Sequence, residues 1–479
     1  MSRKVAIVGA GPAGMMAAYF AAEGGAEVYL YDKNPVIGKK LIYVPWDGCE
    51  ITQTGDTEDF MENYARGAEF LQYTLDKFGY KNIIKFFKQL NVELHTDENG
   101  VVSPLNGESS KIQEVFEEKL KELGVEFCMS SKVQEVLAEG RKITGIKVHN
   151  LEREFDKVVI ATGGAARPKL GATGDGYRFA EGLRHSIIEP KPAMTEIETE
   201  ERLGKLLGGL TLSPVIISIY NNRSKLFERK GTVTFTDHGI NGDTVLFLSG
   251  VVARLIDKGR VEISLDLYPK ASREKLEREL IEESSMTSHY TVGEILKRYI
   301  PSQLLPVLSR FFRIQESKPM SHITNLERKS LIIFVKDFRL TVKRVKPFFS
   351  ALYTSGGVDT EEVNPKSMES KMMKGLYLCG EVLDVDGGPG GYNIHSALAT
   401  GYIAGKSVAR GVKAAKAAEK KTTKAVKIKE EKPAAVKKTA KKKAVKKVKK
   451  AVKKTAKKTK AVKKKKAKKA ERGSSRRVA

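Results

Sequence analysis

Three glycines near the N-terminus have the spacing of a nucleotide-binding turn. Gly9, Gly11 and Gly14 follow the apolar residues 5–8 in the pattern GxGxxG, and an alanine-rich stretch continues the chain. Glycines so placed make a tight turn, let the backbone approach a pyrophosphate and allow close helix–strand packing. Asp32 ends a second apolar run, where a carboxylate accepts a ribose hydroxyl. The stretch predicts a dinucleotide-binding strand–helix–strand unit; the alternative is a glycine-rich turn in an unrelated α/β protein.

Two later segments also end an apolar run in glycines that could expose backbone to a ligand. Thr162 and Gly163 belong to an ATGG sequence that ends the apolar residues 157–160. Such an ending places backbone against a ligand, because a Cβ would intrude there. Near residue 380 another apolar run ends in Gly380-Glu381, and a glycine-rich loop ending at Gly391 opens a helix. Amides at a helix N-terminus stabilise a negative, electron-rich ring edge or a carbonyl oxygen.

Four side chains near these motifs could donate a proton, namely His395, Tyr392, His238 and Cys49. For each of them a structural role is favoured over a catalytic one, because the sequence does not fix their geometry. The catalytic residue therefore stays unknown at this level. The cysteines and histidines also lack a metal-ligand spacing, so no metal site is predicted.

The elements that must position these residues divide the chain. Residues 1–190 are predicted to form the first part of the nucleotide-binding domain, with a helical segment at 56–95. Residues 191–350 change to alternating strands with a charged helical insert at about 270–331. Residues 351–411 return to the nucleotide-binding domain, and residues 412–479 form a tail. This order predicts an α/β fold whose binding domain is discontinuous.

Composition restricts the compartment and the partners. The chain has 3 cysteines, far apart in sequence, which favours a reducing, cytoplasmic compartment without structural disulfides. No apolar run is long enough for a transmembrane segment, and glycines and a proline interrupt the N-terminal one, so a signal peptide is not predicted.

The positive charge lies in the C-terminal tail. Residues 412–479 hold 31 of the 85 Lys and Arg residues but 4 of the 58 Asp and Glu residues, so they account for the whole net charge of +27. High like charge and low hydrophobicity predict disorder. The tail resembles those of linker histones, and we expect it to bind RNA or DNA non-specifically by neutralising phosphates. The alternatives are a solvated extension and attachment to an anionic membrane surface.

The motifs together resemble a known flavoprotein family. GxGxxG with Asp32, ATGG followed by GATGDGY, and GLYLCGEVLDVDGGPGGYN occur in the order of the BaiN/RdsA family, also labelled aminoacetone oxidase family FAD-binding proteins. The resemblance covers residues 3–410. It implies a Rossmann-like FAD-binding domain interrupted by a β-barrel-like unit with a helical insert.

The resemblance also implies individual contacts with FAD. Gly9, Gly11 and Gly14 would hold the pyrophosphate and Asp32, with its neighbour Lys33, the adenosine ribose. Further contacts would come from Lys40 near the phosphates, Val133 at the adenine, Gly380 and Glu381 at the ribityl chain, and Tyr392, Asn393 and Ile394, beside Gly391, at the pyrimidine edge. The chain departs from the family after GKKL, at residues 100–104 and at His395, which concerns the substrate rather than FAD.

The expected activity is hydride transfer through flavin N5 to or from a C=C or C=N bond, because the cofactor carries the redox chemistry. NAD(P)H would be a transient electron donor, since the sequence contains a single dinucleotide fingerprint. The substrate would be a small molecule or an RNA base. The alternative is a flavin-binding protein, associated with the nucleoid or ribosome, that senses redox state or has no catalytic role.

Overall fold

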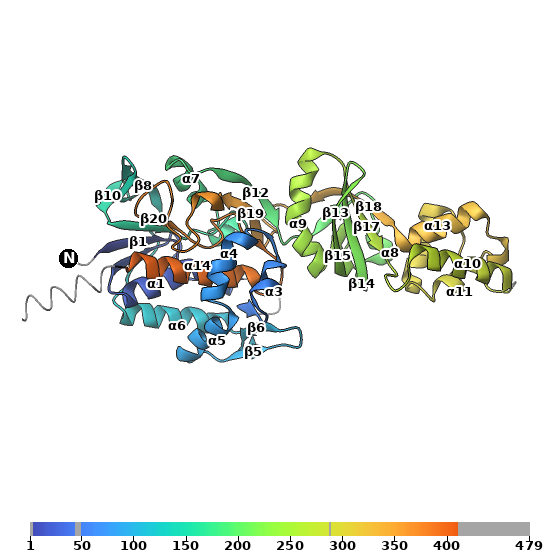
Figure 1. Cartoon of the computed structure of the whole chain (residues 1–479), viewed down its shortest axis with the longest axis horizontal. Helices are drawn as coiled ribbons and strands as arrows, with labels where there is room; N and C mark the ends of the chain where they lie inside the picture. The colour runs from blue at the N-terminus through green and yellow to red at the C-terminus, as the bar shows by residue number, and fades with distance from the viewer. Residues whose placement is uncertain (1–2, 44–48, 287–288, 411–479) are drawn as a thin grey trace, which may run out of the picture. The chain divides into compact units, whose positions relative to one another are not determined.

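Five parallel strands form the central sheet in the order β20–β11–β1–β2–β7, of which β1 and β20 are labelled in Figure 1. The computed structural model describes residues 3–43, 49–286 and 289–410. The strands span Lys4–Val8 (β1), Glu27–Tyr31 (β2), Glu126–Cys128 (β7), Lys157–Ile160 (β11) and Leu376–Leu378 (β20). The apolar residues of β1 and β11 are almost fully buried, as a sheet covered on both faces requires. The first and last motifs of the sequence therefore belong to one sheet.

Helices α1 (Pro12–Glu23) and α14 (Tyr392–Val408) pack against each other, and α6 (Ser109–Glu122) packs against α1 (Figure 1). Small residues make this approach possible. A Cβ on Gly401 would lie 2.3 Å from the Ala13 carbonyl oxygen, and one on Gly405 would lie 2.6 Å from that of Ala17. The alanine- and glycine-rich composition of both helices thus serves packing between the two ends of the domain.

Smaller sheets flank the central one. Strands β8 (Val133–Glu139), β9 (Lys142–Val148) and β10 (Leu151–Glu154) form an antiparallel sheet. Strands β3 (Thr52–Gln53), β6 (Val101–Pro104) and β5 (Leu94–Thr96) form another. Three short helices precede β5: α3 (Thr57–Met61), α4 (Ala68–Lys77) and α5 (Tyr80–Gln89).

The prediction of a helical segment across residues 56–95 is wrong at its end, where β5 begins at Leu94, and in its interior. A strand, β4 (Tyr64–Arg66), separates α3 from α4 and pairs with β21 (Asp386–Gly387). The hydrogen-bonding partner lies more than 300 residues further along the chain, so local periodicity could not reveal it. This pairing attaches the α3–α4 region to the loop that precedes α14.

A closed antiparallel barrel is inserted in the chain between strands β12 (Ile187–Ala193) and β19 (Tyr353–Val358), which pair with each other. Its strand order is β13–β16–β15–β14–β17–β18. The strands span Ile197–Thr199 (β13), Thr211–Asn221 (β14), Ser224–Phe235 (β15), Gly239–Asn241 (β16), Val261–Asp266 (β17) and Phe338–Val345 (β18). Helix α9 (Asp243–Leu255) packs against β12 and β15. Closure pairs every barrel strand on both sides and leaves no open edge.

The helical insert lies between β17 and β18. Its helices span Arg273–Met286 (α10), Val292–Leu296 (α11), Leu305–Val307 (α12) and Asn325–Lys336 (α13). Capping boxes begin α11 at Thr291 and α13 at Thr324. Buried leucines of the insert, such as Leu276 and Leu280, share one hydrophobic core with the barrel, whereas the nucleotide-binding part has its own.

These elements confirm the predicted fold class, a Rossmann-like α/β domain interrupted by a barrel-like unit with a helical insert. The prediction of a disordered tail falls on residues 412–479, which lie outside the described part of the chain. None of the described helices is long and apolar enough to span a membrane.

Candidate functional site

A cavity of about 110 Å³ lies at the carboxyl ends of the parallel strands. This is the edge at which open α/β sheets bind ligands. Its lining brings together residues from all three sequence motifs, including Gly9, Gly11, Asp32, Lys40, Thr162, Gly163, Glu381, Asn393 and Ile394. Residues that are nearly 400 positions apart in sequence therefore meet around one cavity.

The three N-terminal glycines have different surroundings. Gly9 has φ +107°, and a Cβ there would lie 2.3 Å from the Ala161 carbonyl oxygen. A Cβ on Gly14 would lie only 1.8 Å from the carbonyl oxygen of Gly9. No heavy atom lies within 4 Å of the Cβ position of Gly11, which borders the cavity. Two of the glycines thus serve packing, and Gly11 leaves space where a ligand can approach the backbone.

Two helix N-termini border the cavity. Gly11 is the N-cap of α1 and Gly391 is the N-cap of α14; neither glycine has a side chain to cap its helix, although the Gly391 amide donates to Glu50. The first amides of a helix lack intrahelical acceptors and carry partial positive charge, so they favour an anionic ligand group. A ligand with a diphosphate and a second electron-rich end, such as FAD, fits this combination of open backbone and two helix N-termini.

Asp32 is held by backbone amides. Its Oδ2 accepts from the Ala10 amide at 2.8 Å and its Oδ1 accepts from the Asn34 amide at 2.7 Å. A smaller cavity of about 40 Å³, also bordered by Gly9, Asp32 and Thr162, adds Lys33 and Val133 to the same region. The side chains expected at the adenosine end are therefore grouped around Asp32.

An ion pair joins the two ends of the domain beside the main cavity. Lys40, in the short helix α2 (Lys39–Ile42), lies 2.9 Å from Glu381 Oε2. Glu381 Oε1 accepts from the Thr354 amide at 3.0 Å, and the Lys40 ammonium lies 4.8 Å from the centre of the Tyr353 ring. The pair fixes Glu381 at the cavity wall.

Four of the expected cofactor residues do not line the two small cavities. Gly14 packs against the turn, and a Cβ on Gly380 would lie 2.7 Å from that of Ala13. A Cβ on Gly391 would meet the backbone of Thr52 at 2.7 Å, and Tyr392 lines a larger cleft instead. These positions bring α1, α14 and β3 close together.

The expected proton donors have unequal surroundings. His395 is fully buried; its Nδ1 lies 2.6 Å from Thr52 Oγ1 and its Nε2 lies 3.2 Å from the Phe78 carbonyl oxygen. Burial lowers the pKa of His395 to about 3, so the ring is neutral at physiological pH. Burial raises the pKa of the Cys49 thiol to about 12, which keeps it protonated. His238 is exposed in the turn between β15 and β16. Of the four, Tyr392 alone lines the larger cleft.

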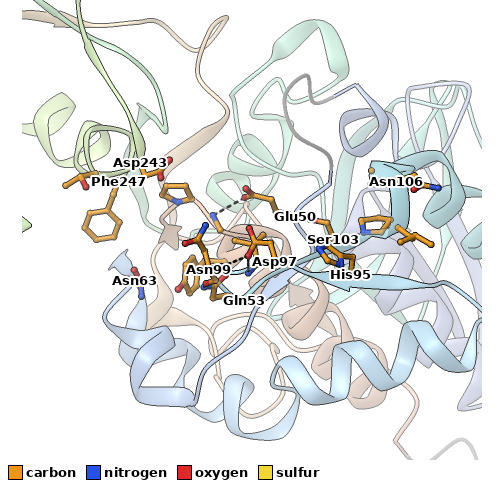
Figure 2. Close-up of a pocket in the computed structure, with 18 of the residues that line it drawn as sticks. Glu50, Gln53, Asn63, His95, Asp97, Asn99, Ser103, Asn106, Asp243 and Phe247 are labelled. Atoms are coloured by element: carbon orange, nitrogen blue, oxygen red, sulfur yellow. Dashed lines mark hydrogen bonds between the residues drawn. The ribbon is translucent and has the colours of Figure 1, made fainter. Parts of the chain in front are cut away.

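The larger cleft, of about 890 Å³, lies between the β3–β6–β5 sheet and the barrel with its helix α9 (Figure 2). Gln53, Asp97 and Asn99 line it from the small sheet, and Asp243 and Phe247 reach it from α9 (Figure 2). Tyr392 and Gly390 also line it, so the cleft extends to the start of α14.

Glu50 connects the cleft to the start of α14. Its Oε2 accepts from the amides of Gly390 and Gly391 at 2.9 and 3.1 Å. Burial raises the pKa of Glu50, and these two amides act in the opposite direction. Glu50, Arg229 and Phe247, which all line this cleft, are not among the residues predicted from the sequence, because neither their type nor their spacing indicates a role for them.

Asp386, in the loop between Glu381 and Gly391, is a buried carboxylate with an unpartnered oxygen. It is 3% exposed, and its Oδ2 has no hydrogen-bond partner among the described residues. Burial raises its pKa from 3.8 to about 6, with a Ser355 hydrogen bond and Arg254 opposing the change. The folded state therefore holds the proton more tightly than the unfolded state, and stability falls as the pH rises from about 4 to above about 6.

We expect Asp386→Asn to remove this pH dependence. The variant should gain stability relative to the wild type by about 2 kcal/mol on going from about pH 4.5 to about pH 7.5. Thermal unfolding of both proteins at the two pH values measures the difference. A stability difference that does not change with pH would contradict the pKa given for Asp386.

No cluster of three or more His, Cys, Asp or Glu residues that could hold a metal ion occurs in the described part of the chain.

Comparison with known proteins identifies the family. The family model described as "HI0933-like protein Rossmann domain" matches residues 3–407. The chain belongs to this family. A 3-dehydro-bile acid delta(4,6)-reductase from Clostridium scindens is 28% identical over 409 residues, covering 85% of this chain and 99% of the relative. A ribosomal RNA dihydrouridine synthase from Haemophilus influenzae is 27% identical, covering 84% and 98%.

A solved structure of a flavocytochrome c3 fumarate reductase also matches, with 18% identity and a TM-score of 0.47, over 86% of this chain and 78% of that one. Membership of the HI0933-like family confirms the resemblance stated from the sequence motifs. The chain is an FAD-dependent oxidoreductase with a nucleotide-binding Rossmann domain.

Proposed function

We propose that this oxidoreductase binds FAD along the carboxyl edge of its parallel sheet and reduces a C=C bond in the adjoining cleft. NAD(P)H is the proposed electron donor. The observation that carries the proposal is that the cavity lined by the three nucleotide-binding motifs and the larger cleft both reach the start of α14. Asn393 and Ile394 border the cavity, and Gly390 and Tyr392 border the cleft.

The residues have the following proposed roles toward FAD. Gly9, Gly11 and the first amides of α1 hold the pyrophosphate, with Gly14 permitting the turn and Lys40 adding a cation. Asp32, with Lys33 and Val133 beside it, holds the adenosine. Thr162, Gly163, Gly380 and Glu381 border the ribityl chain, and residues 391–394 at the start of α14 hold the pyrimidine edge. When bound, FAD supplies hydride chemistry at flavin N5.

The names of the relatives favour reduction of an unsaturated ring. One is a reductase of a 3-dehydro-bile acid and the other forms dihydrouridine in ribosomal RNA. A C=C bond accepts hydride readily when it is conjugated with a carbonyl group, because the oxygen takes up the electron pair. We therefore propose an unsaturated carbonyl compound, either a small molecule or an RNA base, as the substrate class.

The absorption spectrum of the purified full-length protein, followed by anaerobic titration with NADH and with NADPH, tests this proposal. We expect a flavin spectrum that is bleached by one of the two nucleotides. A protein that holds FAD but is reduced by neither would favour the second candidate function, a flavin-binding redox sensor. A protein that retains no FAD after reconstitution would contradict both.

The basic tail supports a second, separable proposal, namely attachment of the protein to nucleic acid, for example at the ribosome or nucleoid. Removal of residues 412–479 takes away the entire net charge of +27. We expect the truncated protein to lose at least about tenfold in affinity for RNA and DNA at low salt, and most of the salt dependence of binding. Fluorescence anisotropy at several salt concentrations measures both. An unchanged affinity and salt slope would contradict the attachment.

A further inference from the structure

Arg229, in β15, brings a cation into the large cleft. The centre of its guanidinium lies 3.9 Å from the centre of the Phe247 ring, close enough for a cation–π interaction. Its Nη2 donates to Asn63 Oδ1 at 2.5 Å, and its Nη1 donates to the Glu62 carbonyl oxygen at 3.4 Å. All of its contacts are therefore with uncharged groups.

Neighbouring arginines of the barrel are paired differently. Arg344 lies 2.7 Å from Glu198, and Arg339 lies 3.2 Å from Glu262. Arg229 makes no ion pair with any carboxylate of the residues that the structure describes. Burial lowers the pKa of its guanidinium, and the charge of Glu62 opposes this only in part, so the cation is partly desolvated without a carboxylate in direct contact. A guanidinium has five N–H donors, so most of the donors of Arg229 remain available to a ligand in the cleft.

The other charges of the cleft restrict the ligand group that Arg229 can bind. The carboxylates of Glu50, Asp97 and Asp243 line the same cleft, together with the imidazole of His95. Two of these carboxylates have fixed partners: Glu50 accepts from backbone amides as described above, and Asp97 Oδ1 accepts from the amides of Asn99 and Val101 at 2.9 and 2.8 Å. Three carboxylates against one arginine disfavour a ligand with permanent negative charge. A neutral carbonyl oxygen avoids that repulsion and can still accept from the guanidinium.

We propose that Arg229, stacked on Phe247, is a catalytic residue that binds the carbonyl oxygen of the substrate and stabilises the negative charge that develops there. This inference rests on the proposed reduction of an unsaturated carbonyl compound. Hydride adds to the β-carbon of the C=C bond, and the π electrons move to form an enolate. The carbonyl oxygen carries the charge beside the guanidinium until a proton from water in the cleft reaches the α-carbon. NAD(P)H is the ultimate reductant in this balance. A preorganised cation at such an oxygen lowers the barrier because the charge exists only after hydride addition.

A phenol is a suitable probe, because its ionised form is a planar oxyanion on an unsaturated carbon, as an enolate is. We would titrate para-nitrophenol with the full-length protein carrying FAD and record difference spectra over a pH series. Binding beside an unpaired guanidinium should lower the pKa of the bound phenol by at least about one unit, because an opposite charge favours the ionised form. This measurement requires no turnover.

The variants separate a ligand-binding role from a purely structural one. Arg229→Gln should raise the pKa of the bound phenol to or above its value in water, because the remaining carboxylates repel the phenolate, and should weaken phenolate binding at least about tenfold. Arg229→Lys should keep part of the effect. Arg223→Gln, at an exposed turn of the same barrel hairpin, is the matched control and should behave as the wild type.

Arg229 also joins the barrel to residues 62–63, so its replacement could weaken the fold. The thermal unfolding of Arg229→Gln should therefore be compared with that of the wild type. If Arg229→Gln does not fold, the wild-type pKa and Arg229→Lys decide the question. A wild-type protein that does not bind the phenol, or that leaves its pKa unchanged, overturns the assignment. So does an Arg229→Gln variant that matches the wild type. Reduction of FAD by NAD(P)H, recorded on the same preparation, tests the proposed function separately.

Discussion

Replacing Gly11 by glutamate is expected to abolish FAD retention while the chain still folds. The Cβ position of Gly11 has no heavy atom within 4 Å, so the backbone tolerates a side chain there. That side chain enters the cavity at the N-terminus of α1, where the pyrophosphate is proposed to lie. A carboxylate would occupy the space and would place like charges together. We expect at least about a hundredfold weaker FAD binding, or roughly 3 kcal/mol.

The measurement is the flavin content after gel filtration, with equilibrium titration of FAD into the stripped protein. The unfolding temperature of the stripped variant should match that of the stripped wild type, since an acidic residue at a helix N-terminus is not destabilising. Gly11→Ala is the matched control and should lose far less affinity. If Gly11→Glu bound FAD as tightly as the wild type, the cofactor could not lie at this edge of the sheet, and the proposed site would be wrong.

Gly14→Ala is expected to act on the fold rather than on FAD binding, with a large loss of stability. A Cβ at this position would lie 1.8 Å from the carbonyl oxygen of Gly9 and 3.5 Å from the Ala161 Cβ. The first contact is with backbone, which cannot rotate away, so α1 must move off the sheet. We expect a loss of about 3 kcal/mol or more, at the upper end of what overpacking costs.

Chemical unfolding of Gly14→Ala beside Gly11→Ala tests this prediction, because both changes add one methyl group to the same turn. Only the first should lower the unfolding midpoint strongly, and it should do so with or without added FAD. An unfolding midpoint of Gly14→Ala close to that of the wild type would mean that α1 does not pack on β1 as closely as the structure indicates.

Local chemistry made the core of the fold predictable from the sequence. The turn after β1 requires glycine at Gly9 and Gly14 for steric reasons that involve residues close in sequence or directly below the turn. The buried strands Lys4–Val8 and Lys157–Ile160 are recognisable in the sequence as short apolar runs, the pattern typical of a parallel sheet covered on both faces. The closing motif before α14 then indicated a flavin family, which the family model confirms.

Side-chain environments were beyond the reach of the sequence. His395 and Cys49 are chemically suitable proton donors, yet burial makes the first neutral and keeps the second protonated. Burial depends on what packs around a side chain, and the partners of His395 come from Thr52 and Phe78, in separate elements. No local pattern contains that information.

The sequence by itself therefore determined the nucleotide-binding unit, the fold class and the charge of the tail, because each follows from residues that are neighbours along the chain. Tertiary structure alone decided the contacts between distant segments: Lys40 with Glu381, strand β4 with β21, and Arg229 with Asn63 and Phe247. The first borders the cavity proposed for FAD, and the last lines the cleft in which the substrate is proposed to bind. They depend on how the barrel and the nucleotide-binding part come together, and the energy of that packing is distributed over many residues with no motif of their own.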